Sequence, residues 1–162
     1  MRPLRPAVVA LGVVFALAGC AAPAAPLPTD SPQETQAVLV DLLDETQEIV
    51  GGEWQIQDSP SPDPCQLPGS GDEGVTFTGS RTLATGLDED ALLAVVDQLE
   101  NEGFEVGRAR VGPFENVRGV MPGNQAFYVL LSSGERVANL TGQAPCVPGD
   151  AYEELEKLRD EE

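Results

Sequence analysis

The chain has 162 residues, of which 27 are acidic and nine are basic, so that its formal net charge at pH 7 is −18. A surface this acidic repels the phosphate backbone of nucleic acids and the anionic headgroups of lipids, which argues against nucleic-acid binding and against membrane binding through charge. Histidine is absent, which excludes every catalytic triad that uses it.

The first 19 residues have the pattern of an export signal. Arg2 and Arg5 form a short basic region, and Ala7–Ala18 is an uncharged apolar run of 12 residues, whereas a membrane-spanning helix needs about 20. The run ends in Leu17-Ala18-Gly19-Cys20, which resembles the lipobox of bacterial lipoproteins. In that family a diacylglyceryl group alkylates the cysteine thiol before a peptidase cuts in front of it. The resemblance implies that residues 1–19 are removed and that Cys20 is the lipid-attachment site.

Residues 20–32 are rich in alanine and proline, a composition that predicts an extended tether between the lipid and the folded part. All 27 acidic residues follow Cys20 and two of the nine basic residues precede it, so the chain after the signal has seven basic residues and a formal charge of −20. The membrane is therefore expected to be a partner only through lipid on Cys20. We expect the protein to lie on the extracytoplasmic face of the cell membrane.

Residues 33–162 are long enough for a single domain with one core. Its first element is predicted to be a helix, because Ser31-Pro32-Gln33-Glu34 has the pattern of a capping box with proline at the first helical position. Gly51-Gly52 ends the apolar face of that helix. A short strand around Trp54 is expected next, followed by a proline-rich loop at Pro60–Pro68.

The later elements alternate in type. Val75–Ser80 alternates apolar with small polar side chains, as a strand with one buried face does. Asp88 is predicted to cap a second helix that ends before Gly103, and Asp150 to cap a final helix with Tyr152 on its inner side. These elements predict an α+β fold, with a mostly antiparallel sheet of about five to six strands and helices packed on one face, in the order α-β-β-α-β-β-β-α. The β-rich runs between the last two helices are Phe104–Val111, Asn116–Met121, Gln125–Ser132 and Arg136–Gly142.

Cys65 and Cys146 remain once Cys20 is assigned to lipid, and both lie in proline-rich segments. Because thiols oxidise in the compartment to which this part of the chain is expected to be exported, and because two thiols allow one pairing, we expect a disulfide between them. A metal or redox site is the alternative, but the chain has no histidine, no further thiol and no CxxC spacing. We therefore expect no metal and no cofactor.

Four arginines are candidates for anion binding. Arg108 and Arg110 fall on the same face of one predicted strand. Arg118 lies on the next strand, and Arg81 ends an earlier one. Guanidinium groups that converge in this way suit a carboxylate or a phosphate ligand. The alternative is that each arginine neutralises neighbouring acids.

The sequence offers little reactive chemistry. Lys157, the single lysine, lies among glutamates, which is a poor setting for a desolvated nucleophile. No stretch matches the spaced acidic pattern of a calcium-binding loop. Trp54 and Tyr128 are candidate binding aromatics, although their alternating strand patterns favour core packing.

The lipobox, the tether, the small acidic domain and the segments Trp54–Cys65 and Val75–Arg81 are together similar to the uncharacterised small lipoproteins of actinobacteria, loosely the mycobacterial LppA-like group. That resemblance implies a cell-envelope lipoprotein and no particular activity. We expect a non-enzymatic module that binds an envelope protein, a peptidoglycan fragment or a small ligand. The alternatives are a carboxylate-based hydrolase of envelope glycans, which needs two acids in one cleft, and a purely structural surface protein.

Overall fold

In the computed structural model, the residues described are 31–160. Cys20, the predicted signal and nearly all of the predicted tether lie outside this range. The helices and strands, in chain order, are α1 (Pro32–Val50), β1 (Trp54–Gln66), β2 (Glu73–Leu83), α2 (Glu89–Asn101), β3 (Glu105–Val111), β4 (Phe114–Met121), β5 (Asn124–Ser133), β6 (Ala138–Gln143) and α3 (Ala151–Asp160).

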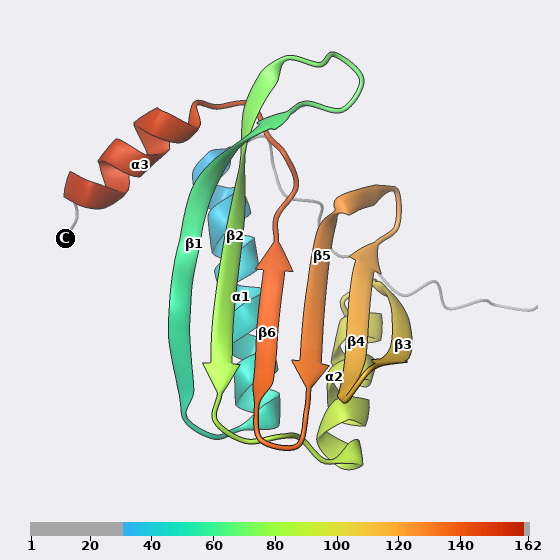
Figure 1. The fold of residues 1–162 in the computed structure, drawn as a ribbon. Coiled ribbons are helices and arrows are strands. Elements are labelled where there is room, and N and C mark those ends of the chain that lie inside the picture. The colour runs from blue at the N-terminus through green and yellow to red at the C-terminus, as the bar shows by residue number, and fades with distance from the viewer. Residues whose placement is uncertain (1–30, 161–162) are drawn as a thin grey trace, which may run out of the picture.

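The six strands form one sheet in the order β1-β2-β6-β5-β4-β3, and every neighbouring pair is antiparallel. Helices α1 and α2 cover one face of this sheet, and within residues 31–160 no helix lies over the opposite face (Figure 1). The predicted α+β class, with an antiparallel sheet and helices on one face, is confirmed. Four strands follow α2, one for each of the four β-rich runs predicted there, although the predicted order counted three.

The core lies between the sheet and the two helices. Large side chains from the four central strands alternate toward the helices, because successive residues of a strand point to opposite faces. Each such side chain, fully buried, stabilises the fold by about 1.5–3 kcal/mol relative to exposure. The core side chains with 0–1 % exposure include Leu39, Leu43, Phe77, Val95, Leu99, Val117, Val129, Leu131 and Leu140.

Helix α1 approaches the sheet closely because two glycines face each other beneath it. Gly79 of β2 pairs with Gly142 of β6. A Cβ atom at Gly142 would lie 2.7 Å from Leu39 Cδ1, and one at Gly79 would lie 3.0 Å from Leu43 Cδ1. The absence of these two side chains therefore sets the distance between α1 and the central strands.

Strand β1 differs from the prediction. It runs for 13 residues and contains three prolines, where we expected a short strand and then a loop at Pro60–Pro68. The pairing with β2 is interrupted by register shifts between Ile56 and Asp58 and between Asp58 and Ser61. Strand β1 is an edge strand, so it has a neighbouring strand on one side only. Prolines, which have no backbone N–H, are tolerated there because no second strand needs that hydrogen bond. Proline content alone therefore gave the wrong prediction for this segment.

The predicted disulfide between Cys65 and Cys146 is confirmed, with a Cα–Cα distance of 6.0 Å. It joins the end of β1 to the segment that follows β6. The backbones of Val75 and Val147 also pair close to it through two hydrogen bonds of 2.9 Å. This corner of the domain is therefore fixed both covalently and by backbone pairing.

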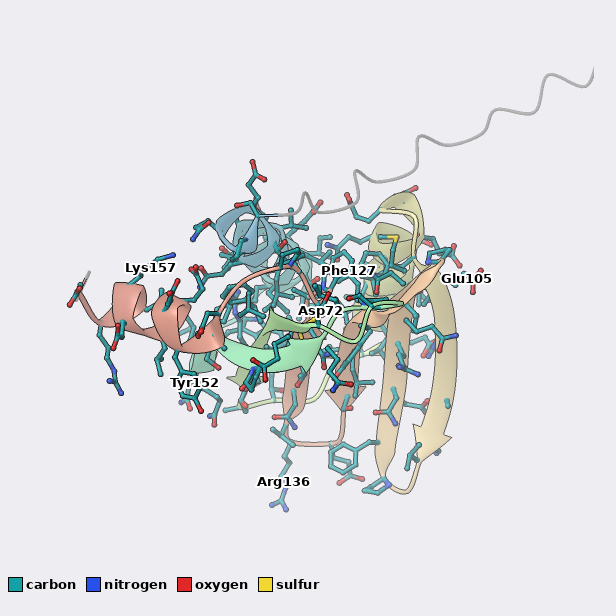
Figure 2. All side chains as sticks on the ribbon, turned by 90° about the horizontal axis from the view of Figure 1, so that it is seen from above. Asp72, Glu105, Phe127, Arg136, Tyr152 and Lys157 are labelled. Carbon is teal, nitrogen blue, oxygen red and sulfur yellow. A yellow bond between two sulfur atoms is a disulfide. The ribbon has the colours of Figure 1, made fainter. Side chains whose placement is uncertain are left out.

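The helix ends follow the predicted caps in two of three cases. Asp88 accepts a hydrogen bond from the Ala91 N–H at 2.9 Å, and Asp150 accepts one from the Tyr152 N–H at 2.8 Å. Ser31 makes no side-chain cap bond. Helix α3 extends past β1, and Tyr152 on it is 76 % exposed, so its predicted inner position is wrong (Figures 1 and 2). Among residues 31–160, no helix has the length and apolar character required to cross a membrane.

The close approach of α1 makes a stability prediction. Gly142→Ala should lower the free energy of unfolding by about 1–3 kcal/mol, because its Cβ would overlap Leu39 and force α1 outward. Urea denaturation measures this change.

Gly107→Ala in β3 is the matched control, since a Cβ there meets no atom within 4 Å. Its free energy of unfolding should stay within about 0.5 kcal/mol of the unsubstituted protein. Equal losses in the two variants would contradict the packing argument.

Candidate functional site

The face of the sheet that no helix covers is the candidate site, and we call it the open face. Strand register aligns its side chains in rows across four strands, and all except Arg118 are half-buried. It consists of Thr78, Ser80 and Thr82 from β2, Asn139, Thr141 and Gln143 from β6, Tyr128, Leu130 and Ser132 from β5, and Asn116, Arg118 and Val120 from β4.

The open face includes no carboxylate among its residues from these four strands, although the chain has 27 acidic residues; on the neighbouring edge strand β3, Glu105 pairs with Val120 of this face. Its polar groups are hydroxyls and amides, some of which bond to one another across strands. Thr82 Oγ1 donates to Asn139 Oδ1 at 3.0 Å, and Ser132 Oγ donates to Asn116 Oδ1 at 2.5 Å. A neutral surface with one arginine therefore occurs within a strongly acidic protein.

Part of the open face and the adjoining side of β3 form a groove of about 630 Å³. This volume lies in the range of small-molecule sites, about 300–1,000 Å³. Its lining combines apolar side chains with amides and three charged residues. We call it the groove, and its lining residues are Glu105, Gly107, Arg108, Ala109, Val111, Asn116, Arg118, Val120, Gln125 and Leu130.

Arg118 is the one cation of the open face. Its Cζ lies 5.3 Å from the centroid of the Tyr128 ring, a distance at which a guanidinium is attracted to the face of the ring. None of the ion pairs found among residues 31–160 includes Arg118. Tyr128 thus lies on the open face rather than in the core, which corrects the favoured prediction for it.

The four candidate arginines do not converge at one site: Arg108 and Arg118 both border the groove, whereas Arg81 and Arg110 do not. Arg118 pairs in register with Gly107, whereas Arg108 pairs with Val117, a core residue. Because neighbouring positions of a strand point to opposite faces, Arg118 lies on the open face and Arg108 lies on the face that the helices cover.

The other three arginines each have an acidic partner. Arg108 makes two hydrogen bonds to the Glu89 carboxylate, at 2.7 and 2.9 Å. Arg110 bonds to Glu115 at 2.5 Å. The hydrogen bonds between Arg108 and Glu89 lower the pKa of Glu89 and raise the pKa of Arg108, so both groups are charged at neutral pH. The alternative, that arginines neutralise neighbouring acids, describes these two pairs.

Arg81 is held beneath α1 and has no access to a ligand. Its side chain is 4 % exposed, and it donates hydrogen bonds to Asp44 and to Gln47 on that helix. Its Nε has no partner among the described residues. Arg81 therefore has a structural position.

Trp54 is partly buried against the core, as its pattern predicted. Its Nε1 donates to the Gly51 carbonyl oxygen at 2.9 Å, which ties the end of α1 to the start of β1. It is not part of the groove.

Among the side chains that the structure describes, no two acids are buried together. The one buried acid among them is Glu154, which is paired with Gln33 at 2.9 Å and with Lys157 at 2.6 Å. The hydrogen bond to Glu154 raises the pKa of Lys157, which keeps this amine protonated. Within residues 31–160 there is also no cluster of three or more side chains that could hold a metal ion.

The sequence contains a signal for the open face that we did not use. The segments that form β5 and β6, NQAFYVLLSS and ANLTGQ, contain no charged residue at all. In a chain with this many acids, two neighbouring strands without any acid indicate a less acidic part of the surface.

Because Arg81 is buried and Asp44 is exposed, removing one or the other should lower the free energy of unfolding by different amounts. Asp44→Ala should lower the free energy of unfolding by about 1–3 kcal/mol, because it leaves a buried cation with less compensation. Arg81→Met should cost less, because Asp44 is 61 % exposed and returns to water. Thermal and urea denaturation of both variants measure the difference. A larger loss for Arg81→Met would contradict this assignment.

Comparisons with known proteins add information about the fold alone. No protein-family model matches the chain, and no curated protein does. A crystal structure at 2.65 Å resolution of a DUF4853 family protein from Actinomyces odontolyticus is similar, with a TM-score of 0.51 and 16 % sequence identity. The similarity covers 78 % of this chain and 70 % of that one. At this identity, the chain has a fold like that of the Actinomyces protein.

Proposed function

We propose that this chain is a lipid-anchored, extracytoplasmic binding protein of the cell envelope, without enzymatic activity, and that its groove binds a largely neutral ligand that presents a carboxylate. Lipid on Cys20 is the proposed anchor. The carboxylate lies beside Arg118, and the rest of the ligand contacts the amides, the hydroxyls and the apolar patches of the open face.

The position of Arg118 is the observation that favours this function. Arg108, Arg110 and Arg81 are each neutralised by an acid, whereas Arg118 contacts the neutral ring of Tyr128. Its guanidinium therefore keeps donors for a ligand carboxylate, and Glu105 is the one acid that lines the same groove. A peptidoglycan peptide and an acidic segment of an envelope protein both have the required group.

Binding is favoured over glycan hydrolysis by the number of acids in the groove. Glycoside hydrolysis generally uses two carboxyl groups on opposite sides of the scissile bond. The groove is lined by one acid, Glu105, at the start of β3. The carboxylate-based hydrolase therefore has less support than the binding module.

The anchor makes a first prediction. Cys20→Ser should move the protein from the membrane fraction to the soluble fraction of its native host, because serine has no thiol to form the thioether. Cell fractionation followed by immunoblotting measures this. Cys146→Ser, which removes the disulfide and leaves Cys20, should stay with the membrane; release of both variants or of neither would contradict the anchor.

The groove makes a second prediction, which uses a photo-crosslinking residue in the intact envelope. p-Benzoylphenylalanine at Leu130, which lines the groove, should form an adduct with the bound ligand or partner. The same residue at Leu93, which is 44 % exposed on α2 on the other side of the sheet, should not form it. Mass spectrometry of the adducts measures both.

Two further variants separate binding in the groove from chance contact. Arg118→Gln should reduce the Leu130 adduct, because it removes the charged donors. Arg136→Gln should not, since Arg136 is exposed in the turn between β5 and β6 and extends away from the domain (Figure 2). Equal adducts at Leu130 and Leu93, or no effect of Arg118→Gln, would overturn the proposed groove.

A further inference from the structure

The two edges of the sheet are unlike each other (Figure 1). At one edge, β1 has three prolines and two register shifts, and α3 contacts it. At the other edge, β3 pairs with β4 over seven residues without a shift and contains no proline. Natural sheets protect their edges with prolines, bulges and covering helices, because an unprotected edge accepts a further strand. Among the described residues, β1 has all three protections, whereas β3 has no proline and no register shift, and α2 contacts it from the helix-covered face of the sheet.

The turn after β3 determines which of its backbone groups are free. Gly112-Pro113 is a two-residue turn, and Val111 and Phe114 are the pair that closes it. The closing pair of such a hairpin is hydrogen-bonded, and hydrogen-bonded pairs alternate along an antiparallel ladder. The N–H and C=O groups of Gly107 and Ala109 therefore point to β4. Those of Val106, Arg108 and Arg110 point outward from the sheet.

The groove begins directly behind this edge. Gly107 and Ala109 are the small residues of β3 that face the groove, and a Cβ at Gly107 would meet no atom within 4 Å. Arg118 is the register partner of Gly107. A residue added opposite Gly107 on a further strand would lie two strand spacings from Arg118, about 10 Å between backbones. A glutamate and an arginine side chain together span that distance across the bare surface of Gly107.

Charge at this edge repels an acidic partner less than the rest of the chain does. The hairpin from Glu105 to Met121 contains three arginines and two glutamates, and with Glu89, which is bonded to Arg108, the local charge is zero in a chain that has −20 after the signal. A second copy of the chain fits poorly, because two molecules of this charge repel each other. Two-fold pairing of β3 about Arg108 would also place the two Arg108 side chains opposite each other, which destabilises a strand pair.

From these observations we infer that β3 accepts an extended acidic segment of another envelope protein as a seventh strand, with a carboxylate opposite Gly107 that reaches Arg118. This inference rests on the proposed function and specifies its ligand. Backbone hydrogen bonds from Val106, Arg108 and Arg110 hold the segment, and the groove receives its alternate side chains.

A random decapeptide library displayed on phage tests this with the full-length chain, oxidised and in detergent micelles. Selected peptides should be enriched in aspartate and glutamate. In hydrogen-exchange NMR, a selected peptide should slow exchange of the Val106, Arg108 and Arg110 amides by 10-fold or more. The Gly107 and Ala109 amides, which already bond to β4, should change much less. No enrichment, or slowing without this alternation, overturns strand addition.

Matched variants at Arg110 isolate the backbone group. Arg110→Ala keeps the outward N–H and Arg110→Pro removes it, while both remove the ion pair with Glu115. Arg110→Pro should bind a selected peptide about 10-fold more weakly than Arg110→Ala, a difference of about 1.4 kcal/mol. Circular dichroism of both variants checks that the fold is kept. The hydrogen-exchange test uses the unsubstituted chain, so it does not depend on whether either variant folds.

The outcomes separate this inference from the proposed function. Equal binding by the two Arg110 variants, with loss of binding in Arg118→Gln, overturns strand addition and leaves the groove as a carboxylate site. Binding that is unaffected by Arg118→Gln overturns the proposed groove and this inference together. Sedimentation that shows a dimer without peptide, abolished by Arg110→Pro, identifies a second copy as the occupant and overturns the inference.

Discussion

The packing of α1 and α2 against a single face of the sheet is the constraint on which the rest of the structure depends. Strand side chains alternate between two faces, so covering one face fixes the role of every position on the other. The residues that face the helices are large and apolar, and Gly79 and Gly142 let α1 come close to them. The residues between them face outward with no helix above. The open face is thus a direct consequence of the core lying on one side of the sheet.

Alternation also explains how far the sequence could predict the fold. Val75–Ser80 was predicted as a strand because one side of it is apolar, and the runs of β5 and β6 because their residues favour strands. Asp88 and Asp150 marked true helix starts because capping is local. The disulfide followed from the number of thiols. In β1 the local signal was misleading, because prolines that would break a central strand are tolerated at an edge.

The site was less accessible to prediction, because it depends on register. The sequence placed Arg108, Arg110 and Arg118 on neighbouring strands, but only the pairing of Gly107 with Arg118 decides that Arg118 faces away from the other two. A change of one residue in the hairpin would have reversed this. Likewise, the capture of Arg81 by α1 requires knowing that the helix crosses β2. Hydrophobic patterns in the sequence identified the helices and strands. Contacts between them showed which of the four candidate arginines has no acidic partner among the described residues.

The disulfide has a mechanical consequence for a chain held from its N-terminal side. The chain enters the described domain at Pro32, and Gly149 lies so close that a Cβ there would be 3.0 Å from Pro32 Cγ. Gly149 is three residues from Cys146, which is bonded to the end of β1, and Gln33 bonds to Glu154 of α3. With the anchor proposed at Cys20, tension on the tether would reach the domain at this cross-linked corner. Edge strand β3, at the opposite side of the sheet, would then be the part least exposed to that load.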